Sequence, residues 1–349
     1  MGKIDLEKLY YSVAQEIAKV DFSKLWEGFI PLKFAIYDDE KCFFDGRYVE
    51  KTIEFCANTA IEYQGENIAI WNVQEELPPS VFASFIIHEM FHAFQEKEGW
   101  DCWADEREAP FKYKYSAENL SLKLRESRLL LGLLDHFDRE KYEKLLACRK
   151  YRSEKFPYEF GYECSIEAIE GSANYVEWQV LEQLDGKEAK VLTDYMREKM
   201  VKPEYYFPIR ICGYYTGALM INAMIQAGDL RYGAKDQPVI RHILEALKPV
   251  TSVDMGGEED VQRITEAVDS YFTETRTIIE KAVADNDVVA TGPLELVSVN
   301  IADARFYDGY LTSHFFVRFR ENGEDKLLRG NFILKMKDEK TIDTVYRWV

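Results

Sequence analysis

Hydrophobic positions recur with the spacing of amphipathic helices over most of this chain. The pattern is clearest from residue 116 onward, and an earlier apolar run follows Pro78-Pro79, with Ser80 as the expected N-cap of a helix. The predicted helices cover residues 6–20, 80–98, 117–135, 138–156, 161–185, 187–200, 209–227, 237–247 and 258–285. The pattern therefore predicts a largely helical protein.

Two regions have the hydrophobic pattern of β-strands instead. Near the N-terminus, strand-like segments occupy residues 32–37, 59–63 and 67–71, and Gln64-Gly65-Glu66 reads as a hairpin turn. Near the C-terminus, residues 313–320 alternate between apolar and polar, and Asn322-Gly323 supplies a second hairpin turn. The predicted fold class is α+β, mostly helical, with a small N-terminal sheet at about residues 30–75 in a domain of residues 1–286. Residues 287–349 are predicted to form a small antiparallel β unit.

Composition limits the class of protein. The 349 residues are 47% hydrophobic and 14% aromatic, enough to bury a sizeable core. The net charge of −18 argues against a nucleic-acid partner and against an anionic membrane surface. Six scattered cysteines without a CxxC pair indicate reduced thiols, and neither a signal peptide nor a membrane span is apparent. We expect a cytoplasmic protein that does not bind a membrane. The sequence does not predict its oligomeric state.

The strongest chemical signal is His88-Glu89-Met90-Phe91-His92, an HExxH motif. On a helix, residues four apart lie about 40° apart around the axis, so both imidazoles project from one face and can bind one zinc ion. Glu89 is then placed to act as general base on a metal-bound water molecule. Apolar neighbours surround the motif, and imidazoles in such a setting are costly unless a partner such as a metal satisfies them. These neighbours are Phe82, Phe85, Ile86, Ile87, Phe91 and Phe94.

A catalytic zinc ion needs a third protein ligand and one open position. None of the other three histidines extends the motif, so a glutamate is the better candidate. Glu163, Glu167 and Glu170 fall on one face of the predicted helix 161–185. Both Glu170 and Glu167 fit as third ligand from the residues alone, and we expect one Zn²⁺ per chain.

The motif followed by Glu170-Gly171-Ser172-Ala173-Asn174-Tyr175-Val176-Glu177-Trp178 resembles the gluzincin metallopeptidases, especially the aminopeptidase N family. The resemblance covers short motifs over roughly residues 60–220, and 77 residues separate His92 from Glu170, which implies an insertion at about 100–160. It implies a zincin-like catalytic domain whose active-site helix carries the motif. It favours Glu170 over Glu167 as the third ligand. It also implies that Glu177 contacts a metal ligand and not the metal itself.

The same resemblance extends to Tyr214-Tyr215-Thr216-Gly217-Ala218, which matches a family segment whose tyrosine stabilises an oxyanion. This role would fall on Tyr214, with Tyr215 as the alternative, because adjacent helical residues point about 100° apart. Gly65-Glu66-Asn67 echoes the amine-recognising motif of the exopeptidases in this family, so Glu66 is a candidate substrate-binding residue.

We therefore expect a zinc metallopeptidase acting on a peptide or small protein. Asn174, Glu177 and Glu167 are candidates for orienting the metal ligands. The strand that precedes the active-site helix, residues 67–73, is expected to pair with an extended substrate. Two alternatives remain: a noncatalytic zinc-binding scaffold with a peptidase-like fold, and a zinc hydrolase of non-peptide amides or esters.

Overall fold

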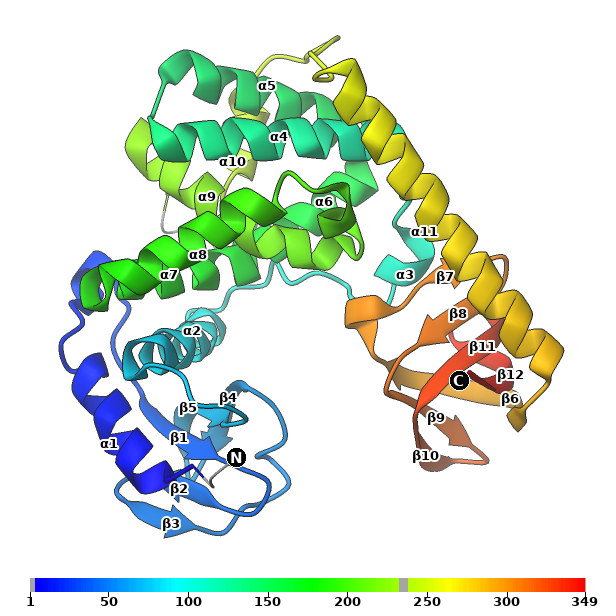
Figure 1. Cartoon of the computed structure of the whole chain (residues 1–349), viewed down its shortest axis with the longest axis horizontal. Coiled ribbons are helices and arrows are strands. Elements are labelled where there is room, and N and C mark those ends of the chain that lie inside the picture. Colours follow the sequence, from blue (N-terminus) through cyan, green and yellow to red (C-terminus); the bar gives the residue numbers. More distant parts are fainter. Residues whose placement is uncertain (1–3, 232–237, 349) are drawn as a thin grey trace.

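The computed structural model describes residues 4–231 and 238–348, which form an α+β fold with two sheets. A body of helices connects a small N-terminal sheet with a larger C-terminal sheet, and the long α11 runs from the helical body to the C-terminal sheet (Figure 1). The α-helices are α1 (Leu6–Ile17), α2 (Pro79–Lys97), α3 (Ala109–Lys112), α4 (Ala117–Asp135), α5 (Arg139–Lys155), α6 (Pro157–Ile166), α7 (Ser172–Leu184), α8 (Gly186–Lys199), α9 (Ile209–Ala227), α10 (Arg241–Ala246) and α11 (Glu258–Asp285).

The N-terminal sheet has the strand order β3-β2-β1-β5-β4. Its strands are β1 (Lys33–Tyr37), β2 (Cys42–Phe44), β3 (Arg47–Val49), β4 (Thr59–Tyr63) and β5 (Glu66–Asn72). β5 pairs parallel to β1 and antiparallel to β4, so β4 is an edge strand. The predicted β4–β5 hairpin is confirmed, with Gln64 and Gly65 at φ of 54° and 81°. The short strands β2 and β3 were not predicted; the turn between them, Asp45-Gly46, also has positive φ.

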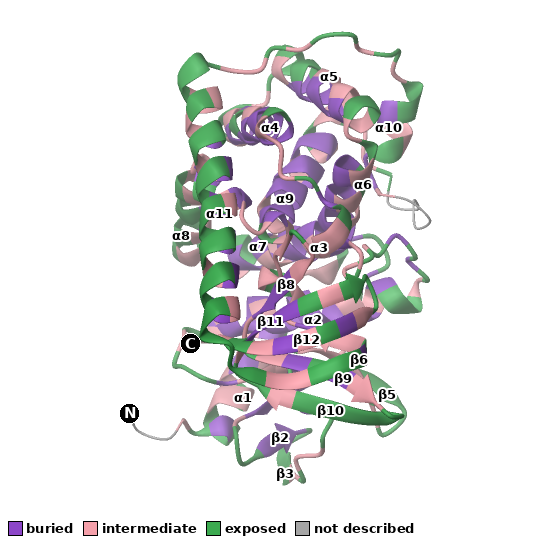
Figure 2. Ribbon diagram, turned by 90° about the vertical axis from the view of Figure 1, so that its right-hand side faces the viewer, coloured by how far each residue is buried: buried purple, intermediate pink, exposed green. Residues whose placement is uncertain are grey.

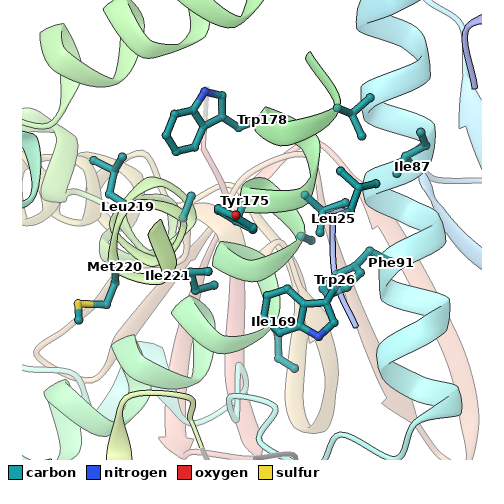
Figure 3. Close-up of a cluster of buried hydrophobic side chains, with 14 of the residues drawn as sticks. Leu25, Trp26, Ile87, Phe91, Ile169, Tyr175, Trp178, Leu219, Met220 and Ile221 are labelled. Carbon is teal, nitrogen blue, oxygen red and sulfur yellow. The ribbon is translucent and has the colours of Figure 1, made fainter. Parts of the chain in front are cut away.

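Helix α2 packs on this sheet and on α7, and it carries the HExxH motif. It begins at Pro79, with no side-chain cap, so the prediction that Ser80 caps it is wrong. Proline suits the first helical position because its missing N–H has no partner there in any case. Part of the interface between α2 and α7 is apolar: Phe91 of α2 and Tyr175 of α7 both lie edge-on to Trp26, and Ile169 lies beside them (Figure 3).

The predicted helix 161–185 is interrupted in the structure. Helix α6 ends at Ile166, a π-helical turn, η2 (Glu167–Gly171), follows, and α7 begins at Ser172. Such turns insert one extra residue per turn and redirect the side chains they carry. Residue 237, at the start of the predicted helix 237–247, lies outside the described residues, and the helix observed there is α10.

The C-terminal sheet is antiparallel throughout, as predicted, in the order β10-β9-β6-β12-β11-β8-β7. Its strands are β6 (Val288–Val299), β7 (Phe306–Tyr307), β8 (Tyr310–Ser313), β9 (Phe316–Glu321), β10 (Glu324–Arg329), β11 (Asn331–Asp338) and β12 (Thr341–Trp348). The predicted strand 313–320 is divided between β8 and β9, because Phe315 adopts a φ of 70°. α11 packs its buried side inward and leaves its outer face exposed (Figure 2).

Of the helices in the described residues, none combines the length and the apolar character that crossing a bilayer requires.

Candidate metal centre

Three side chains from two elements, α2 and η2, converge in a cavity that Thr59 and Ala60 of β4 also line. His88 and His92 lie on successive turns of α2, with their Nε2 atoms 3.1 Å apart. Glu170, from η2, places its Oε2 atom 3.3 Å from Nε2 of His92 and 3.8 Å from Nε2 of His88. A tetrahedral zinc site with bonds of about 2.0–2.1 Å separates its donor atoms by about 3.3 Å, so this triangle has the dimensions of such a site.

Hydrogen bonds at the far side of each ring fix the orientation of the imidazoles. Nδ1 of His88 lies 3.0 Å from the Glu177 carboxylate, which can only accept while ionised. Nδ1 of His92 lies 2.8 Å from Oε1 of Gln95, whose amide nitrogen donates to the carbonyl of Ile169 and to Ser172. Both Nδ1 atoms therefore donate, and both Nε2 lone pairs face the centre of the triangle.

Two lone pairs held 3.1 Å apart repel each other unless a cation lies between them. Burial alone would lower the pKa of His88, but the carboxylates of Glu170 and Glu177 raise this pKa to about 10. The two carboxylates therefore favour a positive charge at the imidazoles. The donor set of two imidazoles and one carboxylate is one that zinc favours, so the residues fit a zinc ion.

Arg210, at the beginning of α9, contacts the second carboxylate oxygen of Glu170, the third residue of the triad. Its Nη2 donates to Oε1 of Glu170 at 2.8 Å, and its Nε donates to Oε1 of Glu106 at 2.8 Å. Burial would raise the pKa of Glu170, but hydrogen bonds to both histidines and the charge of Arg210 hold it well below its usual range. Glu170 is thus kept ionised with Oε2 free toward the histidines.

The predicted general base and oxyanion donor both line the cavity at the triad. Glu89 is buried, and burial raises the pKa of its carboxyl above the usual range. The hydroxyl of Tyr214 accepts a hydrogen bond from Nη1 of Arg210, and burial and the Glu170 carboxylate raise the pKa of Tyr214. Tyr215 lines the same cavity, but its ring stacks on Tyr205. Tyr214 is therefore the tyrosine whose hydroxyl belongs to the network of Glu170.

The cavity has a volume of about 590 Å³, and Thr59 and Ala60 of the edge strand β4 form part of its wall. Its walls combine the triad with aromatic rings, among which Trp71 and Phe85 stack at 4.9 Å. The lining residues are Asn58, Thr59, Ala60, Trp71, Phe85, His88, Glu89, His92, Glu96, Trp103, Glu170, Asn174, Glu177, Arg210, Tyr214 and Tyr215.

Glu167 does not join the triad, although sequence spacing made it a rival of Glu170. It lies instead in a fully buried ion cluster, where Lys123 donates to it at 2.8 Å and Arg149 forms a second ion pair. Arg152, Glu126 and Glu163 complete this cluster beneath η2. The expectation that Glu167 orients a metal ligand is wrong, because its carboxylate oxygens bond to Lys123, Arg149 and Thr216 instead. Asn174 reaches the Glu170 carbonyl at 3.4 Å rather than an imidazole.

Two substrate-binding expectations need correction. Glu66 pairs with Lys33 at 2.8 Å and does not line the cavity, so it is not placed to recognise a substrate amine there. The strand expected to pair with substrate, β5, lies between β1 and β4 and has both edges occupied. The free edge beside the triad belongs to β4, whose Thr59 and Ala60 line the cavity.

Sequence reasoning missed Gln95 and Arg210. Gln95 is a fully buried polar residue three positions after His92, so a polar group on the apolar motif helix was a usable signal. Arg210 lies one helical turn before Tyr214, and this spacing was a weaker signal.

Comparison of the chain with protein-family models, with curated proteins and with solved structures finds no match.

Proposed function

We propose that this protein is a zinc-dependent metallopeptidase of the gluzincin kind. The observation that carries the proposal is the convergence of His88, His92 and Glu170 with donor separations of 3.1–3.8 Å, beside a buried glutamate one residue after the first histidine. A purely structural site has no use for Glu89 and favours four protein ligands. The proposal assigns a zincin-like catalytic domain to residues 1–286, with α2 as its active-site helix, and a separate β unit to residues 287–349.

His88, His92 and Glu170 would hold the ion, and zinc bound by such a set polarises a carbonyl and lowers the pKa of bound water to about 7. Glu89 accepts a proton from the attacking water and delivers it to the leaving amine. Its raised pKa, caused by burial, suits a group that must both take up and release a proton.

Tyr214 supplies a hydrogen bond to the oxygen that becomes negatively charged as the peptide bond is attacked. Its raised pKa keeps the hydroxyl protonated at neutral pH, and Arg210 holds the phenol oxygen in place. The free edge of β4 provides backbone groups against which an extended peptide lies by strand addition.

The first test is zinc stoichiometry by mass spectrometry on protein purified without chelator. We expect close to one zinc per chain in the wild type and a sharp loss in His92→Ala and Glu170→Ala. The exposed Glu75→Gln is the matched control and should keep its zinc. Absence of zinc from the wild type after supplementation would overturn the proposal.

Hydrolysis is tested separately with a mixed peptide library. Glu89→Gln should keep its zinc and lose roughly 10²–10⁴-fold in kcat, because the general base is removed while the ligands stay. Zinc binding without hydrolysis of any peptide would favour the noncatalytic scaffold, and hydrolysis of small esters or amides alone would favour the non-peptide hydrolase.

A further inference from the structure

A second cavity lies between the segment before α4, the beginning of α9, α11 and the C-terminal β unit. Its volume is about 240 Å³. Phe111, Tyr115, Tyr162, Tyr271 and Phe306 contribute rings to its walls. We call this cavity the aromatic chamber.

The aromatic chamber and the cavity of the metal triad are neighbours, because one side chain, that of Arg210, lines both. Arg210 lines both cavities, and its guanidinium reaches Glu170 on one side and Glu106 on the other, each at 2.8 Å. Glu106 lines the chamber and accepts a hydrogen bond from Tyr162 at 3.2 Å. The chamber therefore begins one arginine side chain away from the third metal ligand.

The polar ends of the chamber's tyrosines have partners in the protein. The Tyr115 hydroxyl accepts from the backbone N–H of Ile209 at 3.2 Å, and the Tyr162 hydroxyl donates to Glu106. These residues thus offer ring surface to an occupant, and burial of an apolar group against it is favourable. The volume is below the roughly 300–1,000 Å³ of pockets that enclose a whole small ligand, and it suits one large side chain.

A third cavity, of about 610 Å³, continues beyond the chamber along β6, and it shares Glu106, Phe111 and Ile301 with it. The three cavities therefore follow one another from the triad to the C-terminal sheet. This succession suits an extended chain that passes the triad.

We propose that the aromatic chamber is a specificity pocket for a large aromatic side chain of the peptide substrate, and that the C-terminal β unit helps to build it. This inference rests on the proposed peptidase function. It gives the β unit a role in substrate selection, through Ala304 and Phe306, which lie in the chamber wall.

The test blocks the aromatic chamber with larger side chains at Ala304, which belongs to the C-terminal β unit. Ala304→Trp places an indole where the occupant would lie, and Ala302→Trp is the matched control, because Ala302 is exposed two residues earlier and does not line the chamber. Ala304→Leu is a milder filling variant in case the indole disturbs folding. Thermal melting and zinc content of each variant show whether the fold and the triad remain intact.

Binding is measured by ligand-detected NMR with N-acetyl-phenylalaninamide and, for comparison, N-acetyl-alaninamide. We expect the wild type and Ala302→Trp to bind the aromatic amide, and both Ala304 variants to bind it at least about tenfold more weakly. No binding to the wild type, or equal binding to the Ala304 variants, would overturn the inference.

Hydrolysis gives an independent readout. A peptide series with Phe or Ala at each position should show a preference for Phe of about tenfold or more in kcat/KM at one position, lost in Ala304→Trp. If no peptide is cleaved while the amide-binding pattern holds, the peptidase proposal fails and the chamber remains a site for an aromatic group.

Discussion

A Cβ atom added to Gly171 would lie 2.5 Å from the Cα of Gly217. The π-turn η2 and helix α9 therefore pack backbone against backbone, and only glycine fits at either position. Glu170 precedes the first of these glycines and Tyr214 lies one turn before the second. The contact consequently brings Glu170, the proposed third metal ligand, and Tyr214, the proposed oxyanion donor, to the same place.

This packing predicts that Gly217→Ala will both destabilise the protein and weaken metal binding. A Cβ there would lie 2.7 Å from the Glu167 carbonyl oxygen, so η2 must shift, at a cost of about 1–3 kcal/mol. Thermal melting and zinc content measure the two effects. Gly161→Ala is the control, because its Cβ meets nothing within 4 Å in α6, and it should be neutral or slightly stabilising. Wild-type zinc content in Gly217→Ala would contradict this explanation.

The orientation of His92 by Gln95 leads to a second prediction. Gln95→Leu removes the acceptor at Nδ1 and leaves the ring free to rotate, so we expect zinc affinity to fall about 10–100-fold. Competition with a fluorescent zinc chelator measures the affinity. Gln262→Leu, on the exposed face of α11, should leave it unchanged. An affinity in Gln95→Leu equal to the wild type would mean that His92 is oriented by packing alone.

The parts of the site that could be predicted are those that depend on local geometry. The relation of His88 to His92 follows from four residues of one helix, and the β4–β5 hairpin follows from Gln64-Gly65. The choice between Glu167 and Glu170 depends on residues distant in sequence, because Lys123 of α4 and Arg149 of α5 form ion pairs with Glu167. The π-turn then separates the two carboxylates further than an ideal helix would.

The errors have the same physical origin. Residues 67–73 have strand character, but whether such a strand is at the edge depends on which strands pair with it, and β1 lies about 30 residues earlier in the chain. Glu66 likewise belongs to a segment that resembles an amine-recognising motif. Because its strand β5 pairs with β1, however, its carboxylate lies beside Lys33 of β1. Local pattern establishes an element, and nonlocal pairing decides its role.

The buried ion cluster predicts a specific dependence of stability on pH. Burial alone would raise the pKa of Glu163, but Arg152 and Lys123 lower it from 4.5 to about 2. Because the folded pKa is lowered, the stabilising contribution is present above the unfolded pKa of 4.5 and is lost as pH falls toward 2. Glu163→Gln should be about 3–5 kcal/mol less stable at neutral pH, since it leaves buried cations without a partner.

The measurement is the melting temperature against pH, with chelator present so that metal release does not contribute. The gap between wild type and Glu163→Gln should narrow as pH falls from about 5 to about 2. Glu198→Gln, which removes an exposed partner of Lys202, should lie close to the wild type throughout. A constant gap for Glu163→Gln would show that its ionisation contributes nothing.

The adjacent tyrosines of α9 allow a matched test of the oxyanion role. Tyr214→Phe removes the hydroxyl that Arg210 holds beside Glu170, and Tyr215→Phe removes one from a ring stacked on Tyr205 at 6.2 Å. If Tyr214 stabilises charge that develops only in the transition state, its loss should lower kcat about 10²–10³-fold and change KM little. Tyr215→Phe should keep kcat within a few-fold of the wild type. A loss confined to KM would assign Tyr214 to substrate binding instead of catalysis. Equal losses in the two variants would show that the Tyr214 hydroxyl has no specific role in the reaction.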